Sequence, residues 1–209
     1  SQIESIELLK GASSTLYGSG AATAVINILL KSPSKDSVSA SFETSLGTNN
    51  TATTSKSSLS DKNQNASING TLGSLRYLAS YSLTGVNGMS AAKSNTSSIF
   101  ENDRYYSKNG LLKLGYGKID KLSVETFLNY DAFEYDFDAG AFSDSDVNTG
   151  RQEQLRLGVK PTYKYNNAEV YLLASLNSIE RNFQQFNSFS NTLDTYQFKG
   201  RSLHLDLVH

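Results

Sequence analysis

The chain has no cysteine and no tryptophan, and only two of its 209 residues are proline. Without cysteine it can form neither a disulfide framework nor a metal site built on thiolates. No window approaches the roughly 18–20 consecutive apolar residues that a membrane-spanning helix requires. The net charge of −1 supplies no positive field for nucleic acid, so we expect no nucleic-acid partner.

Motifs of catalysis are missing as well. The chain carries no nucleophile elbow, no pair of histidines at metal-binding spacing and no glycine-rich dinucleotide loop. Gly18-Ser19-Gly20 lacks the Lys-Ser/Thr that would follow in a phosphate-binding loop. The two histidines, His204 and His209, form no triad with scattered Ser and Asp unless the geometry is right. We therefore predict that the protein is not an enzyme and requires no cofactor.

What the sequence does contain is a period of two that starts at Val38 and continues to the end of the chain. Apolar residues alternate with polar ones, as in strands with one apolar and one polar face. Twelve tyrosines, ten phenylalanines and the scarcity of proline also favour strands. Eight runs follow this pattern, with no helix among them: 38–46, 66–72, 76–83, 112–117, 122–130, 155–164, 169–177 and 202–207.

The connections between these runs alternate in length. Three are tight turns at 73–74, 118–120 and 166–167, and four are long polar linkers at 48–63, 87–107, 135–152 and 184–195. Short turns on one rim and long loops on the other are typical of outer-membrane barrels. A soluble β-sandwich or jelly roll also alternates, but its strands are usually shorter than the ~9–11 residues of a membrane-crossing strand. We predict an all-β fold: a partial transmembrane antiparallel β-barrel of about eight meander strands.

The first 31 residues differ from the rest of the chain. They read as a short strand around Ile3-Glu4-Ser5-Ile6-Glu7, a glycine-broken helical turn around Leu16-Tyr17-Gly18-Ser19-Gly20, and an apolar strand ending at Lys31. This string resembles the closing segment of the plug domain of TonB-dependent outer-membrane receptors. Order and spacing agree, although Ala12 stands where that family usually has proline. The residues that carry the motif are Gly11, Tyr17, Gly18, Gly20 and Asn27.

The resemblance implies three parts: the C-terminal end of a plug domain at 1–32, a connector at 33–36 and the first part of the barrel at 37–209. Barrels of this family have 22 strands around a plugged lumen. We therefore expect the chain to be a fragment, without the Ton box, the rest of the plug or the remaining strands. The polar start at Ser1-Gln2 and the end at His209, within an alternating run, agree with this expectation.

The resemblance also implies a function: TonB-energised import of a scarce, bulky nutrient across the outer membrane. Within the family, strand spacing and loops are most similar to the cobalamin receptors, so cobalamin or a related corrinoid is the first ligand expected. A ferric siderophore or haem is the alternative. The expected partners are outer-membrane lipid, TonB and the ligand itself. Aromatic loop residues are the expected ligand contacts: Tyr105, Tyr106, Phe133, Tyr135, Phe142, Phe183, Phe186 and Phe189.

A function of a different class is a β-sheet surface adhesin that binds glycans or protein. It predicts that a second sheet covers apolar residues such as Leu155, Leu157 and Leu203. A full-length protein that is monomeric in plain buffer would favour it over a transporter.

Charged residues of the plug-like segment provide another expectation. In the family, plug glutamates pair with barrel arginines, which implies contacts of Glu4 and Glu7 with Arg76 and Arg156. Burial of such charges is costly unless they are paired. The alternative is that these glutamates are solvated at a strand edge.

Acidic residues are dense in two of the long linkers, which read Glu101-Asn102-Asp103 and Asp131 to Asp146. The cobalamin receptors bind calcium through acidic residues in the loops after barrel strands 3 and 5. Calcium takes six to eight oxygen ligands, which several loop carboxylates can supply. The expected calcium ligands are Tyr135, Asp136, Asp144, Asp146 and Asp103; the alternative is a solvated acidic surface.

Overall fold

The computed structural model of the chain describes residues 3–11, 23–30, 33–34, 37–49, 59–88, 90, 92, 100–118 and 120–209. In these ranges ten strands form two antiparallel sheets and no helix occurs, which confirms the predicted all-β class. No described helix could therefore cross a membrane. The strands are β1 (Ile3–Lys10), β2 (Ala24–Leu30), β3 (Ser39–Gly47), β4 (Asp61–Leu72), β5 (Leu75–Asn87), β6 (Arg104–Gly117), β7 (Leu122–Asp136), β8 (Thr149–Tyr165), β9 (Ala168–Asn187) and β10 (Thr192–Val208).

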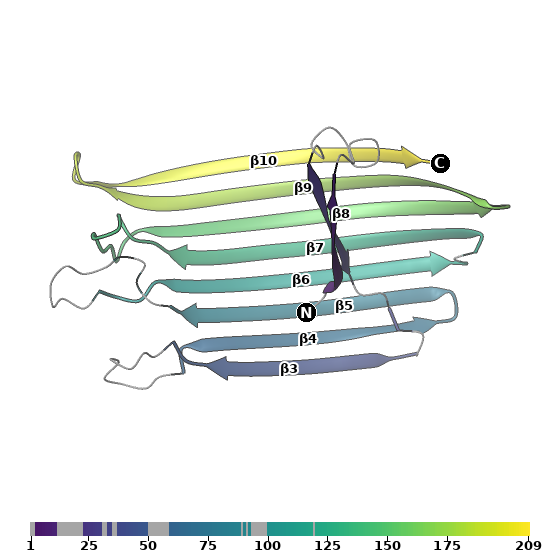
Figure 1. Cartoon of the computed structure of the whole chain (residues 1–209), viewed down its shortest axis with the longest axis horizontal. Coiled ribbons are helices and arrows are strands. Elements are labelled where there is room, and N and C mark those ends of the chain that lie inside the picture. The colour runs from purple at the N-terminus through teal and green to yellow at the C-terminus, as the bar shows by residue number, and fades with distance from the viewer. Residues whose placement is uncertain are drawn as a thin grey trace.

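The larger sheet is an uninterrupted meander in which each strand from β3 to β10 pairs with its neighbour in sequence (Figure 1). The eight runs of the sequence are found in it, as are the tight turns at 73–74 and 166–167; the third turn, at 118–120, includes a residue outside the described ranges. Most strands are longer than their hydrophobic period indicates; β9 has 20 residues. Near the loops the outward face becomes polar and charged while aromatic side chains stand on the inward face, so the hydrophobic pattern changes face while the backbone ladder continues.

Apolar side chains of the sheet lie together on one face, which we call the outward face. The register joins leucines of five neighbouring strands in one row, and Ala79 and Ile68 extend this row to β4. The five leucines are Leu112, Leu128, Leu157, Leu176 and Leu203. They are 37–69% exposed, and the only buried hydrophobic side chains among the described residues are Leu78 and Leu111. The sheet therefore presents its apolar side to its surroundings instead of enclosing a core.

The outward apolar band has the height of a bilayer core. Tyrosines mark both of its edges, with Tyr81 and Tyr130 towards the loops and Tyr116, Tyr163 and Tyr165 towards the tight turns. Along β8 the band covers about 34 Å of strand, which is roughly 25 Å of height at a tilt of about 40°. Aromatic girdles around a band of this height are typical of membrane β-barrels.

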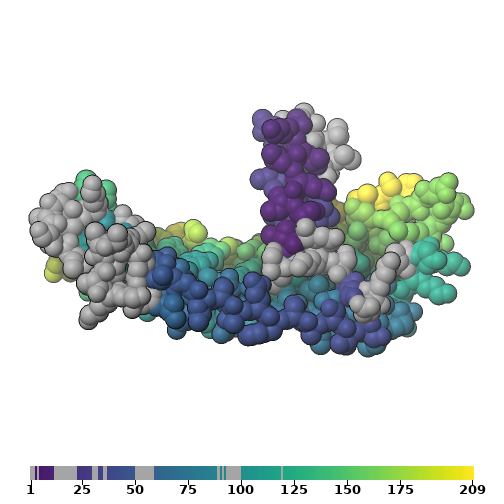
Figure 2. All heavy atoms as spheres, turned by 60° about the horizontal axis from the view of Figure 1, so that its bottom comes forward, coloured from purple at the N-terminus to yellow at the C-terminus, as the bar shows by residue number. Residues whose placement is uncertain are grey.

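The opposite, inward face is polar and carries the connection to the smaller sheet. The backbone N–H of Ser34 donates to Oδ1 of Asn69, and the hydroxyl of Thr71 donates to the carbonyl of Ser34, both at 2.8 Å. Asn69 and Thr71 belong to the polar face, since they alternate with Ile68 along β4. Figure 2 shows the β1–β2 hairpin projecting from one side of the large sheet. In the described ranges, no second sheet covers the outward band as the adhesin alternative requires.

Two glycines on the inward face allow aromatic rings to lie flat across the neighbouring strand. A Cβ on Gly158 would stand 2.2 Å from the ring of Phe127, and a Cβ on Gly150 would stand 2.3 Å from the ring of Tyr135. Such pairing of a strand glycine with a cross-strand aromatic ring compensates for the missing side chain.

Substitution of Gly158 by alanine should therefore destabilise the sheet by about 1–3 kcal/mol, because the ring of Phe127 must move. Urea-induced unfolding of the refolded full-length protein in detergent would measure the change. Gly110→Ala is the matched control, since a Cβ at Gly110 meets nothing within 4 Å. In a Phe127→Ala background the cost of Gly158→Ala should largely disappear, and an equal cost in both backgrounds would contradict the contact.

Candidate functional site

Aromatic side chains gather on the inward face where the strands approach the long loops. Tyr105 on β6, Phe133 and Tyr135 on β7 and Phe137 directly after β7 form a ladder, with ring centroids 6.2, 6.1 and 5.9 Å apart. A second group lies on β9 and β10, where Phe183 stacks on Tyr196 at 4.7 Å and on Phe198 at 5.9 Å. The register connects the two groups through Gly150, which pairs with Tyr135 on one side and Phe183 on the other. We call these seven side chains the aromatic row.

One guanidinium accompanies the aromatic row. Arg181 pairs in register with Phe198 and Gln152, so it belongs to the same inward face. Its side chain is exposed and has no ion pair among the described residues. Below the row the same face is lined by amides, and Gln154 donates to Asn177 at 2.7 Å. Flat apolar surfaces, one free cation and amide groups suit a bulky, aromatic and negatively charged ligand.

The structure places the residues expected from the sequence to contact a ligand in three different positions: on the inward face, on the outward face and in loops. Tyr105, Phe133, Tyr135 and Phe183 belong to the aromatic row. Tyr106 and Phe186 lie on the outward face, because each is next to an inward residue in a strand. The sequence had predicted loops at both positions, whereas the structure has β6 and β9 there. Phe142 and Phe189 are exposed in loops, at 61% and 102%. Sequence reasoning missed Phe137, Tyr196, Phe198 and Arg181. An extension of the period of two beyond 122–130, 169–177 and 202–207 would have found them.

Carboxylates from two loops converge next to the aromatic row. Glu101 and Asp103 precede β6, and Asp138 follows β7; one oxygen of each lies within 4.8 Å of the others. Asp144 joins them, since its Oδ2 accepts the backbone N–H of Glu101 at 3.4 Å. Oδ1 of Asp138 and Oδ1 of Asp144 are buried and have no hydrogen-bond partner. Oxygens of this kind without a partner fit a hard divalent cation such as calcium.

Within the acidic loop cluster (Glu101, Asp103, Asp138 and Asp144), the pKa values of Glu101 and Asp138 shift in opposite directions. A hydrogen bond with Asp144 raises the pKa of Glu101, and desolvation and the negative charges of Asp144 and Asp138 add to the rise. Desolvation acts to raise the pKa of Asp138 too, but hydrogen bonds from the backbone of Ala92 and the hydroxyl of Ser90 outweigh it, so its pKa is lowered. Asp138 therefore keeps its charge at a pH where Glu101 is protonated.

This cluster overlaps only in part with the calcium ligands expected from the sequence. Asp103 and Asp144 belong to it. Asp136 instead accepts from Nε of Arg104 at 2.8 Å, Tyr135 lies over Gly150, and Asp146 is exposed outside the cluster. The expected set drew on the same two loops, but the structure brings Glu101 and Asp138 into the cluster, about 35 residues apart in sequence, in place of Tyr135, Asp136 and Asp146.

The charged residues expected to join plug and barrel have other partners in the structure. Glu7 accepts from Nδ2 of Asn27 at 3.0 Å, across the β1–β2 hairpin. Arg156 binds Asp131 at 3.0 Å on the neighbouring strand, and Arg76 donates to the carbonyl of Gly117 at 3.0 Å. No ion pair links the hairpin to the large sheet in the described part of the chain. The side chain of Glu4 lies outside the described part, so its contact with the barrel stays a prediction.

Two of the plug-motif residues are described. Gly11 has a φ of 113°, which an L-residue rarely adopts, and its N–H donates to the carbonyl of Thr23 at 2.8 Å. Asn27 provides the contact with Glu7 given above. Tyr17, Gly18 and Gly20 lie outside the described residues, so the motif is only partly visible.

Comparison with known proteins gives a match in fold but none in sequence. No family model matches the chain, and no curated protein matches it. Among solved structures the chain is similar to the siderophore receptor PirA from Acinetobacter baumannii, with a TM-score of 0.66 and 16% sequence identity. The match covers 99% of this chain and 31% of that receptor, so the chain spans about a third of its length. At this identity the likeness establishes the fold.

Proposed function

We propose that the chain is part of an outer-membrane receptor that captures a scarce, bulky nutrient and imports it with energy supplied by TonB. The observation that carries this proposal is that the two faces of the large sheet differ in character. A roughly 25 Å apolar band with tyrosine edges faces outward, and a polar face that carries the β1–β2 hairpin faces inward. The similarity in fold to a siderophore receptor supports it.

The parts have distinct tasks in this mechanism. The outward band contacts outer-membrane lipid, and the loops and the aromatic row take the ligand from the outside. The hairpin belongs to a plug that blocks the lumen, and TonB pulls on a segment of that plug to open a path. None of these steps forms or breaks a covalent bond, so the receptor is not an enzyme.

A ferric siderophore with aromatic chelating groups is the ligand that the aromatic row fits best. Such a chelate is anionic and flat at its periphery, so its rings can stack on Phe183 and Tyr196 while Arg181 neutralises its charge. Cobalamin is the second candidate, favoured by the acidic loop cluster, which is similar in kind to the calcium-binding loops of cobalamin receptors.

Binding and uptake together test this function. The full-length protein, refolded in detergent, is titrated with a ferric catecholate chelate, a ferric hydroxamate chelate and cyanocobalamin, with the change in tyrosine fluorescence as the readout. We expect the catecholate chelate to bind most tightly and its uptake into cells to require TonB. Tighter binding of cyanocobalamin would move the proposal to the second ligand, and uptake that persists without TonB would overturn the transport mechanism.

We also propose that the acidic loop cluster binds calcium and thereby joins the loops before β6 and after β7. Glu101, Asp103, Asp138 and Asp144 would hold the ion. Its charge would compensate the four carboxylates and fix both loops beside the aromatic row.

Calcium affinity should rise with pH, because the ion binds the deprotonated cluster and must displace the proton that the carboxyl of Glu101, whose pKa is raised, retains. Below the raised pKa of Glu101 the affinity should fall by up to about tenfold per pH unit. Isothermal titration of the full-length protein at several pH values would measure this slope. Glu101→Gln should flatten it, whereas Asp146→Asn, which changes a carboxylate outside the cluster, should preserve it. Absence of binding heat at neutral pH would end the proposal.

A further inference from the structure

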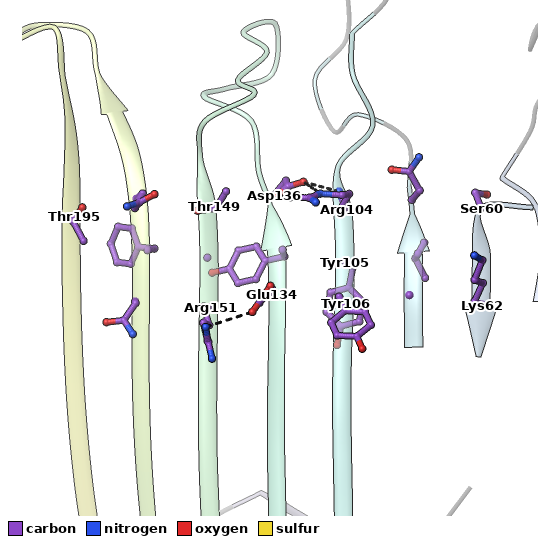
Figure 3. A pocket seen from close by; sticks show the side chains of 18 of the residues that line it. Ser60, Lys62, Arg104, Tyr105, Tyr106, Glu134, Asp136, Thr149, Arg151 and Thr195 are labelled. Carbon is purple, nitrogen blue, oxygen red and sulfur yellow. Dashed lines mark hydrogen bonds and ion pairs between the residues drawn. The ribbon is translucent and has the colours of Figure 1, made fainter. Parts of the chain in front are cut away.

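A belt of cations lies on the outward face directly above the apolar band. It consists of Lys62 on β4, Arg104 and Lys108 on β6, Arg151 on β8, and Lys199 and Arg201 on β10. The register places all of them on the same face as the leucine row. Lys62, Arg104 and Arg151 line a hollow of about 1020 Å³ that extends across the strands near the loops (Figure 3).

Three cations of this belt are compensated by carboxylates of the same face. Arg104 pairs with Asp136 at 2.8 Å, and Arg151 binds Glu153 and also lies 3.7 Å from Glu134. Lys199 pairs with Glu180 at 3.4 Å. Figure 3 shows the first pair and the Arg151–Glu134 contact, both between residues that line the hollow.

The other three cations have no ion pair among the described residues. Lys62 and Arg201 are exposed, and the ammonium of Lys108 lies 5.2 Å from the centre of the Tyr106 ring. With four carboxylates against six cations, the belt has a surplus of two positive charges. An anion from outside the chain would therefore find uncompensated charge here, at the level where an apolar membrane core gives way to headgroups.

A separate, shallow apolar groove of about 480 Å³ lies on the same face, on strands β6 to β10. Its lining includes Leu112, Leu128, Leu157, Leu176 and Leu203. Lys108 precedes Leu112 by four residues on β6, and Arg201 precedes Leu203 by two residues on β10, so cations and groove meet on the same strands. Cationic groups above an apolar groove match a molecule with an anionic head and long acyl chains.

We propose that the outward face binds phosphorylated lipids, with their phosphates at Lys62, Lys108 and Arg201 and their acyl chains along the leucine groove. The inference rests on the proposed membrane location but not on the transported ligand. The belt extends from β4 to β10, about 29 Å at the usual strand spacing, so it accommodates more than one lipid side by side. The charge surplus favours phosphate groups, and the groove favours a lipid over soluble phosphate.

The test compares lipid enrichment around the full-length protein in nanodiscs. The discs contain phosphatidylcholine with a small fraction of fluorescent phosphatidic acid, and energy transfer from a donor attached near the belt reports enrichment. The triple variant Lys62→Gln/Lys108→Gln/Arg201→Gln should lose enrichment by about fivefold for each cation removed. Lys113→Gln, on the inward face of β6, is the matched control and should behave like the unchanged protein.

Each outcome decides the proposal. Equal enrichment around the triple variant and the control would overturn it while leaving the membrane location intact. Failure of the unchanged protein to enter nanodiscs would overturn both the membrane location and this inference. Complete displacement of phosphatidic acid by soluble inorganic phosphate at equal concentration would show that the acyl groove contributes nothing, which also contradicts the proposal.

Discussion

Leu203→Arg should weaken insertion of the refolded full-length protein into bilayers by about 2–4 kcal/mol, whereas Ser202→Arg should have little effect. The two positions are adjacent on β10, so their side chains point to opposite faces. Leu203 pairs with Leu176 in the middle row of the outward band. An arginine there must leave water for lipid, while one at position 202 faces the polar interior.

Reversible unfolding of both variants from liposomes would measure the difference. A control in detergent micelles should show a smaller gap, because detergent adapts to an isolated charge more easily than a bilayer does. If both variants insert equally well, the outward face does not contact lipid. The soluble β-sheet alternative would then be the better explanation of the alternating pattern.

Loss of the aromatic contact at Phe183 should reduce affinity for the ferric catecholate chelate by about 10–100-fold, since one ring of a stacked cluster supplies roughly 1.5–3 kcal/mol when buried by a ligand. Phe183 stacks on both Tyr196 and Phe198, so its removal also loosens their rings. Arg181→Gln should weaken the same ligand and make its binding less sensitive to salt, because the charge that attracts the chelate is gone.

Phe186→Ala is the matched control for Phe183→Ala. It removes the same side chain from the same strand, but from the outward face. The titration with the ferric chelate used above measures all three variants. Equal losses for Phe183→Ala and Phe186→Ala would show that the aromatic row is not the ligand surface, and an unchanged affinity for Phe183→Ala would show the same.

Most of the fold could be predicted from the alternation of apolar and polar residues. Every apolar residue placed on a common face, from Leu112 to Leu207, lies on the outward face in the register. The tight turns were also predictable, because Gly73 and Asn166 adopt positive φ values, which their residue types tolerate. The strand ends near the loops were not, since the apolar residues move from the outward to the inward face there, which interrupts the hydrophobic pattern while the ladder continues to Asn187.

The candidate site was less predictable than the fold, for two physical reasons. The acidic loop cluster combines Glu101 and Asp103 with Asp138. The conformation of the two loops brings these residues together, and loop conformation produces no periodic pattern in the sequence. Adjacent residues point to opposite faces only if they lie in a strand. The sequence placed Tyr105 and Tyr106 in a loop and grouped them, whereas both lie in β6 and face opposite ways. The ion pairs also depend on which residues are neighbours in the sheet. Arg156 pairs with Asp131 on the adjacent strand and not with a distant glutamate.

If the sheet lies in the outer membrane as proposed, the alternation that places Leu203, Leu205 and Leu207 on one face also determines how the chain can reach that membrane. Because every second residue is polar, no continuous segment is apolar enough to halt in an inner membrane as a helix would. The same chain becomes apolar on one side only when its strands pair. Export across one bilayer and residence in another are therefore compatible in a single sequence, and the change from one to the other is made by sheet formation itself.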